Sequence, residues 1–223
     1  MKVLIFGATG MVGQGVLRAC LDAADVEQVV TVGRRATGRQ HPKLREVVQA
    51  ELLGIAAIGA QLAGFDACLF CLGLTTTRAS EREYTRVTHD ITLACATLLA
   101  ETSPDLTLVY LSGARTEAAS KAMQPRVRAL TEAALRRLPF RRPVIILRPE
   151  MIVPVDGARP RTPALRLFYA MMKPVLSALA LIAPHHFLTT RQIGQAMLAL
   201  VREPPAKPVL DGAAILAVAR ERK

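Results

Sequence analysis

Three glycines near the start of the chain have the types and spacing that could hold the diphosphate of a dinucleotide. Gly7, Gly10 and Gly13 follow an apolar run at residues 3–6 and precede apolar residues at helical spacing. The order strand, glycine turn, helix is the context that gives such a motif meaning. One glycine permits a sharp turn, the second lets a diphosphate approach the main chain, and the third lets the helix pack on the sheet. Free N–H groups and the helix dipole then attract an anion.

We therefore predict that this turn binds a dinucleotide. The residues expected to contact the cofactor here are Gly7, Thr9, Gly10, Met11, Val12 and Gly13. The alternative is a glycine-rich turn without a ligand, but such a turn would not need all three glycines.

Two arginines stand where a dinucleotide fold meets the adenosine ribose, after an expected strand at 28–32. An acidic residue at this place binds the 2′-hydroxyl of NAD, whereas a basic residue accommodates the 2′-phosphate of NADP. Arg34 and Arg35 follow Gly33 without a carboxylate, and the planar guanidinium suits a phosphate. The sequence thus favours NADP(H) over NAD(H). The alternative is a pair of solvated loop arginines, because Arg39 shows that this loop is basic anyway.

The elements that must position these residues alternate between strands and helices as far as residue 147. Strands are expected at 3–6, 28–32, 44–48, 66–71, 106–111 and 144–147, and helices at 11–23, 51–62, 81–100 and 123–132. Two short helices within 165–183, a helix capped by Thr189 and Thr190, a strand near 208–210 and a helix from Gly212 complete the pattern.

This pattern predicts an α/β fold, namely a Rossmann-like doubly wound parallel sheet with helices on both faces and a small C-terminal helical roof. We expect a single NAD(P)-binding domain over residues 1–223, in which 154–190 forms the substrate-side loop and helical cap. A chain of 223 residues suits one such domain.

Cysteine usage and the N-terminal sequence predict a cytoplasmic protein. The glycine motif interrupts the first apolar run, so no signal peptide is expected. Cys20, Cys68, Cys71 and Cys95 suggest no disulfide framework. Cys68 and Cys71 have C-x-x-C spacing, but in a strand they point to opposite faces. Small buried side chains are favoured over a redox pair or a metal site, and no metal is predicted.

The net charge of +11 belongs to the C-terminal half, where residues 111–223 hold nineteen Lys/Arg against seven Asp/Glu. Three interpretations compete: a solvated basic face, an anionic substrate or membrane-surface partner, and nucleic acid. Dispersed charges and few aromatic residues favour the first and argue against nucleic acid. The apolar stretch 165–183 contains Arg166, Lys173 and Pro174, which oppose a membrane span. A membrane-surface contact stays as the weaker alternative.

The chain resembles the short-chain dehydrogenase/reductase superfamily, in particular its extended and atypical branches and their small bacterial epimerase/dehydratase-like members. The resemblance rests on the first glycine motif, Val32-Gly33-Arg34, Phe70-Cys71-Leu72-Gly73, Val109-Tyr110-Leu111-Ser112-Gly113, Arg148-Pro149 and Thr189-Thr190. It implies that Leu72 and Gly73 form a turn beside the ribose and nicotinamide. It further implies that Ser112 hydrogen-bonds the substrate oxygen, and that Arg148 and Pro149 begin the turn that covers the nicotinamide. Thr75, Thr76 and Thr77 either bind phosphate or cap a loop.

The superfamily's Tyr-x-x-x-Lys pair, in which tyrosine exchanges a proton and lysine holds the ribose, is missing. Gln124 and Arg128 take these positions. Arginine can keep the ribose hydrogen bonds and the charge, whereas glutamine cannot exchange a proton. Tyr169 and Lys173 have the spacing, but they lie after the sixth strand, in the wrong part of the fold. His185 and His186 are interpreted as loop residues near the presumed pocket.

Two functions stay open. The first is an NADP-dependent oxidoreductase or epimerase acting on an unknown small molecule, in which Ser112, a water or a residue of the C-terminal roof relays the proton. The second is an NADP(H)-binding sensor or scaffold without turnover, which the loss of both Tyr and Lys favours. A weaker third is a membrane-peripheral assembly factor that uses residues 165–183.

Overall fold

A parallel sheet forms the centre of the computed structural model, which describes residues 1–74, 79–160 and 162–221, and at 173, 174, 177 and 181 the main chain alone. The strand order among the described residues is β3-β2-β1-β4-β5-β6-β9, and all neighbours are parallel. The strands are β1 Lys2–Phe6, β2 Gln28–Gly33, β3 Leu44–Val48, β4 Ala67–Phe70, β5 Thr107–Leu111, β6 Ile145–Arg148 and β9 Val209–Asp211. The predicted α/β fold and its parallel sheet are confirmed.

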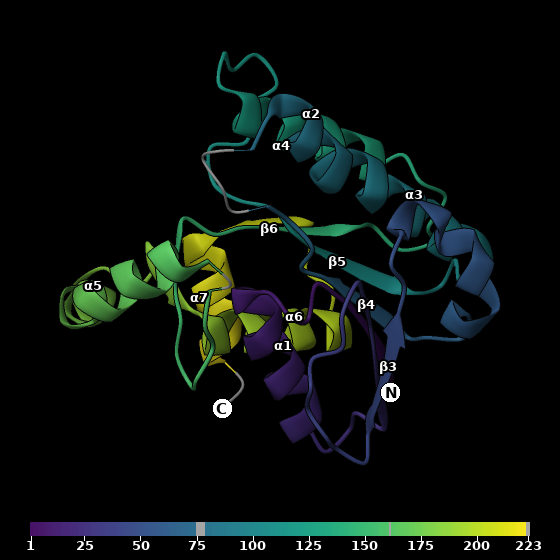
Figure 1. Ribbon diagram of the computed structural model, residues 1–223, viewed down its shortest axis with the longest axis horizontal. Coiled ribbons are helices and arrows are strands. Elements are labelled where there is room, and N and C mark those ends of the chain that lie inside the picture. Colours follow the sequence, from purple (N-terminus) through teal and green to yellow (C-terminus); the bar gives the residue numbers. More distant parts are fainter. Residues whose placement is uncertain (75–78, 161, 222–223) are drawn as a thin grey trace.

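Helices cover both faces of this sheet (Figure 1). One face carries α1 Met11–Asp22, α6 Thr190–Arg202 and α7 Gly212–Arg220, and the other carries α2 Glu81–Thr85, α3 Ile91–Thr102 and α4 Met123–Leu135. The π-helical turn η2 Arg86–Asp90 joins α2 to α3, and the 3₁₀ segment η1 Leu52–Leu62 replaces the short helix expected at 51–62. Helix α5 Pro163–Ile182 extends away from the sheet at one end of the molecule.

The alternation of apolar side chains in β1 supplies two cores. Val3 and Ile5 join the core beneath α1 and α6, whereas Leu4 and Phe6 join the core beneath α3. Phe6 stacks on Phe70 of β4 with ring centroids 4.9 Å apart. A parallel strand buried on both faces needs this continuous apolar sequence, which is why β1 could be recognised in it.

Close contact between α1 and α6 fixes the helix that follows the glycine turn. A Cβ at Gly15 would lie 2.5 Å from the carbonyl oxygen of Thr190, and one at Gly194 would lie 2.8 Å from that of Gly15. Arg202 at the end of α6 binds the Asp25 carboxylate at 2.5 and 3.0 Å. These contacts with α6 therefore fix the position of α1, whose N-terminus follows the glycine turn.

The Asp25–Arg202 pair should make stability depend on pH in the acid range. The hydrogen bond from Arg202 lowers the pKa of Asp25 below its usual value of 3.8. The pair's contribution is therefore present above about pH 4 and lost as the pH falls through the lower folded-state pKa. Because both side chains are a third to a half exposed, we expect Asp25→Asn to lower the free energy of unfolding by about 0.5–1 kcal/mol at neutral pH. Urea unfolding of the wild type and of Asp25→Asn, at neutral pH and near pH 2, checks this. A difference in the free energy of unfolding that is as large near pH 2 as at neutral pH contradicts the prediction.

The region after β6 differs from expectation in two ways. A single helix, α5, stands where two short helices were predicted, because the helix continues through Pro174. A proline removes one main-chain hydrogen bond and leaves the carbonyl four residues earlier free, and Ala170 is exposed, where water can replace that bond. Two short strands, β7 Met151–Val153 before α5 in the chain and β8 Phe187–Thr189 after it, pair with each other in parallel. Neither strand was predicted. No helix in the described part of the chain has the length and apolarity to cross a bilayer.

Candidate functional site

The strand order reverses between β1 and β4, since β1 leads outward to β2 and β3 whereas β4 leads to β5 and β6. In open parallel sheets, ligands bind in the crevice beyond the carboxyl ends of the strands at such a point. One residue directly follows the end of each of these four strands: Gly7 after β1, Cys71 after β4, Ser112 after β5 and Pro149 after β6. The predicted site residues therefore arise at one edge of one sheet.

The glycine turn has the geometry that a diphosphate needs. Gly7 has φ +81°, and a Cβ there would lie 2.6 Å from the carbonyl carbon of Cys71. A Cβ at Gly13 would lie 2.1 Å from the Gly7 oxygen, which itself accepts from the Gly10 amide at 2.9 Å. Gly10 is the N-cap of α1, and no side chain caps that end. The first amides of α1 are therefore available to an anion, and the turn fits the cofactor predicted for it.

The predicted adenosine-side residues come together beside this turn. Arg34 and Arg35 line one hollow with Gly7 and Thr9. An adjoining hollow of about 290 Å³ is lined by Thr9, Arg35 and Arg39 among others. The Thr37 amide donates a hydrogen bond to the Glu46 carboxylate at 2.6 Å. This bond anchors the loop that carries the two arginines.

A cavity of about 290 Å³ lies on the other side of the turn and collects most of the remaining predicted residues. Its lining includes Gly10, Met11, Val12, Leu72, Gly73, Ser112 and Arg128. A second hollow of about 540 Å³ shares Ser112 and Arg128 with it and adds Gln124 and Pro149. We call these the inner cavity and the outer hollow. Thr75, Thr76 and Thr77 lie outside the described residues.

Ser112 is tied to a buried ion pair that the sequence did not reveal. Its Oγ donates to Oε1 of Glu132 at 2.6 Å, and Glu132 is fully buried in α4. Arg148 donates to the same carboxylate from Nη2 at 2.5 Å and from Nε at 3.2 Å. An ionised carboxylate only accepts hydrogen bonds, so the Ser112 proton points to Glu132. In this arrangement Ser112 offers the cavity an acceptor rather than a proton.

Arg148, which the resemblance places at the start of the turn that covers the nicotinamide, binds a carboxylate of this protein. Its guanidinium binds Glu132, and it does not line the inner cavity or the outer hollow. Pro149 does line the outer hollow, and its carbonyl accepts from the Ala114 amide at 2.9 Å. Contacts of these two residues with a cofactor stay predictions.

Arg128 stands between the inner cavity and the outer hollow. Gly113 makes room for it, because a Cβ there would lie 2.6 Å from Nη1 of Arg128. Nη2 donates to the Ala114 carbonyl at 3.1 Å, whereas the buried Nε has no hydrogen-bond partner among the residues that the structure describes. The hydroxyl of Thr88, in the π-helical turn η2, is also buried without a partner in the inner cavity wall. π-Turns often occur at functional sites, and both residues that carry these unpaired groups line the inner cavity.

Three tyrosines that were not predicted for the site also line the inner cavity: Tyr84, Tyr110 and Tyr169. Burial raises the pKa of Tyr110 and Tyr169 above the usual value of 10. Tyr169 comes from α5, and its hydroxyl donates to the Ile152 carbonyl at 3.1 Å. The expectation that Tyr169 lies in the wrong part of the fold is therefore wrong as to place, because its side chain lines the inner cavity although α5 extends away from the sheet.

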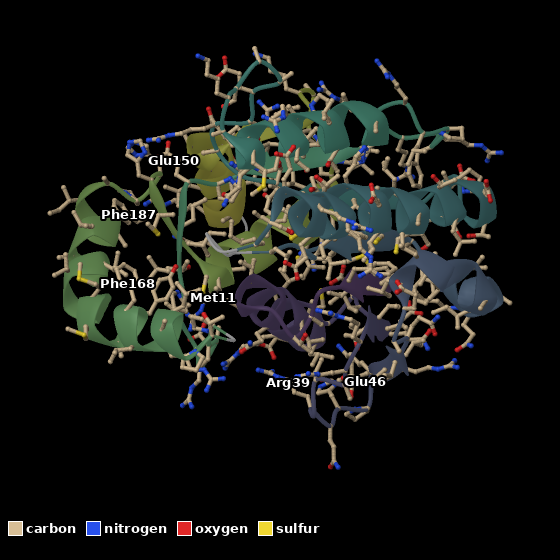
Figure 2. The ribbon with its side chains drawn as sticks, turned by 45° about the horizontal axis from the view of Figure 1, so that its top comes forward. Met11, Arg39, Glu46, Glu150, Phe168 and Phe187 are labelled. Atoms are coloured by element: carbon tan, nitrogen blue, oxygen red, sulfur yellow. The ribbon has the colours of Figure 1, made fainter. Side chains whose placement is uncertain are left out.

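His186 and Glu150 form a pair in the wall of the outer hollow. They precede β8 and β7, whose parallel register aligns Met151 with Phe187. This alignment brings Nδ1 of His186 within 2.8 Å of Oε2 of Glu150. Figure 2 shows Glu150, Phe187 and Met11 toward the end of the molecule that carries α5. The interpretation of His186 as a plain loop residue missed this pairing, which only the β7–β8 ladder creates.

A parallel sheet with a glycine turn at its switch point defines a dinucleotide-binding protein of the Rossmann type. The profile of the NAD dependent epimerase/dehydratase family matches residues 3–140. The chain therefore belongs to the NAD-dependent epimerase/dehydratase family, whose members use a nicotinamide dinucleotide.

Relatives and solved structures agree with this assignment. Protein fmp52, mitochondrial, of Aspergillus fumigatus is 30% identical over 187 residues, which are 80% of this chain and 78% of that protein. The enzyme WbmF of Bordetella bronchiseptica in complex with NAD⁺ has a TM-score of 0.69 at 16% identity, over 98% of this chain and 76% of that one. A UDP-N-acetylglucosamine 4-epimerase from Methanobrevibacter ruminantium has a TM-score of 0.68 at 14% identity, over 93% and 74%. At these identities the two structures establish the fold alone.

Proposed function

We propose that this protein is an NADP(H)-dependent oxidoreductase or epimerase-type enzyme acting on a small molecule, with Gln124 and Arg128 in place of the usual Tyr and Lys. The observation that carries the proposal is the continuity of the glycine turn with the inner cavity, whose wall holds Ser112 and Arg128. A bound nicotinamide would supply the hydride chemistry, so the chain has to orient it and handle the proton.

Each part of the site has a separate task in this proposal. The amides of Thr9, Met11 and Val12 hold the diphosphate, and Leu72 and Gly73 contact the ribose and nicotinamide. Arg128, with its unpaired Nε, binds the ribose or the substrate. Ser112 accepts a hydrogen bond from a substrate hydroxyl, since its own proton is engaged by Glu132.

Proton exchange falls to the C-terminal roof in this account. Gln124 cannot exchange a proton near neutral pH, and burial raises the pKa of Tyr110 and Tyr169 further from neutrality. Among the described residues that line the two spaces, His186 supplies the imidazole, a side chain that can both accept and release a proton. Glu150 holds its ring at 2.8 Å. We expect His186, directly or through water, to serve the proton step.

The preference for NADP(H) rests on the arginines after β2. We expect Arg34→Ala and Arg35→Ala each to weaken NADPH binding about tenfold, because each removes a charge-assisted contact to the 2′-phosphate. NADH binding should change less than about twofold, since that ligand lacks the phosphate. Isothermal titration calorimetry measures both constants. Arg137→Ala, at an exposed position beyond α4, is the matched control, and equal wild-type affinity for NADPH and NADH contradicts the preference.

A cofactor-binding sensor or scaffold without turnover is the alternative. The hydrogen bond that engages the Ser112 hydroxyl and the absence of Tyr and Lys from α4 favour it. NADPH oxidation with phenanthrenequinone and a panel of small aldehydes distinguishes the two. Turnover that falls at least about tenfold in Ser112→Ala and in His186→Gln supports the enzyme. Tight NADPH binding without turnover on the panel favours the sensor.

Location in the cytoplasm belongs to the same proposal. It is supported by four cysteines that form no disulfide, although the fungal relative is named as mitochondrial. We expect a small-molecule substrate and no nucleic-acid partner, because the basic residues are dispersed and few aromatic residues accompany them.

A further inference from the structure

Helix α5 carries an apolar face that nothing in the described part of the chain covers. Of the nine exposed large apolar side chains among the described residues, five belong to this one helix: Leu167, Phe168, Met171, Val175 and Ile182. Met171 and Ile182 are 71% and 80% exposed. At about 100° per residue, the five positions fall within an arc of about 100° on the helix surface. They form a continuous stripe, which we call the outer stripe of α5.

The opposite side of α5 already has its partner within the protein. Leu176 is buried, and Tyr169 donates to the Ile152 carbonyl next to the inner cavity. The side of α5 that packs on the protein is therefore not the side that carries the outer stripe. Figure 1 shows α5 at the periphery, away from the sheet, so the stripe is free to meet an external surface.

The charge around the stripe indicates what that surface is. Residues 157–202 contain six Lys/Arg and no Asp or Glu. Arg159 and Arg166 are exposed, and neither is in an ion pair in the part of the chain that the structure describes. Arg166 donates to the Pro160 carbonyl, which leaves its positive charge uncompensated. At about 100° per residue, Arg166 lies roughly 150° around the helix from the centre of the stripe, on the side that faces water when the stripe is inserted. An apolar face opposite a cationic face is the pattern of a helix that lies in the plane of an anionic bilayer surface.

We infer that α5 docks this protein on anionic lipid membranes, with its axis along the surface and the outer stripe inserted among the acyl chains. The helix does not have the length and apolarity of a membrane span, so it lies on the bilayer. A second copy of the chain is the less suitable occupant. Pairing two α5 helices along their stripes would place two segments side by side that carry positive charge and no acidic residue over 157–202, and such like charges oppose association.

Sedimentation of the full chain with unilamellar vesicles tests this inference. We expect binding to phosphatidylcholine vesicles that contain phosphatidylglycerol, at least tenfold weaker binding to phosphatidylcholine alone, and loss of binding at high salt, where surface charges are screened. Met171→Glu and Val175→Glu should each lower the partition coefficient about tenfold. Both positions are exposed, so the thermal unfolding midpoint should not change.

Leu130→Glu is the matched control, since it places the same charge at an exposed apolar position, 52% exposed, on α4. It should bind vesicles as the wild type does. Absence of wild-type binding, equal binding to both vesicle types, or equal loss in Leu130→Glu overturns the inference. A dimer that Met171→Glu dissociates in sedimentation velocity, without vesicle binding, assigns the stripe to a second copy instead and also overturns it.

Discussion

Glu132→Ala is expected to lower the free energy of unfolding by about 3–5 kcal/mol. The carboxylate is fully buried in α4 and accepts hydrogen bonds from Arg148 and Ser112. Removing it leaves the guanidinium of Arg148, itself about one-third exposed, without its counter-charge beside the core. Guanidinium chloride unfolding of the cofactor-free protein measures the change.

Two further variants separate this ion pair from the general effect of losing a glutamate. Glu132→Gln keeps the shape and the hydrogen-bond acceptor, so it should recover part of the loss. Glu101→Ala, at an exposed position at the end of α3, should change stability by less than about 0.5 kcal/mol. A loss in Glu132→Ala no larger than that in Glu101→Ala would show that the buried pair does not contribute to stability.

Gly10→Ala is expected to weaken NADPH binding about 100-fold while the fold stays intact. A Cβ at Gly10 would meet one atom of its surroundings, the Gly7 oxygen at 3.2 Å, so the cofactor-free protein tolerates it. The methyl group would occupy the side of the turn that a diphosphate must approach. Calorimetric titration gives the affinity, and thermal unfolding without the cofactor gives the stability.

Gly13→Ala provides the contrast within the same motif. Its Cβ would lie 2.1 Å from the Gly7 oxygen and 2.8 Å from the Ala8 Cα, so the turn itself must shift, at a cost of about 1–3 kcal/mol. Gly54→Ala is the control, since its Cβ would have no neighbour closer than 4.0 Å. If Gly10→Ala binds NADPH as tightly as Gly54→Ala does, the assignment of the motif is wrong.

The parts of the fold that could be predicted are those determined by residues close together in the sequence. The strand at 44–48 and the Thr189 cap of α6 agree with the structure, because apolar runs and capping residues act over a few positions. Cys68 and Cys71 do point to opposite faces, one into each core. The 3₁₀ form of η1 was not apparent, since its apolar sequence is equally compatible with an α-helix.

The parts that could not be predicted depend on distant residues or on very short elements. Glu132 and Arg148 meet across α4 and β6, and their link is hidden until the sheet is assembled. Strands β7 and β8 have three residues each, too few for an alternating pattern to be visible. The place of Tyr169 at the inner cavity depends on that small sheet, since its hydroxyl donates to the Ile152 carbonyl of β7.

A crystal structure of the protein with NADPH tests the central claim most directly. We expect the diphosphate within hydrogen-bond distance of the main-chain amides of Thr9, Met11 and Val12, beside Gly10 and without an intervening side chain. A cofactor found elsewhere, or one whose diphosphate is held by side chains away from this turn, would contradict the account.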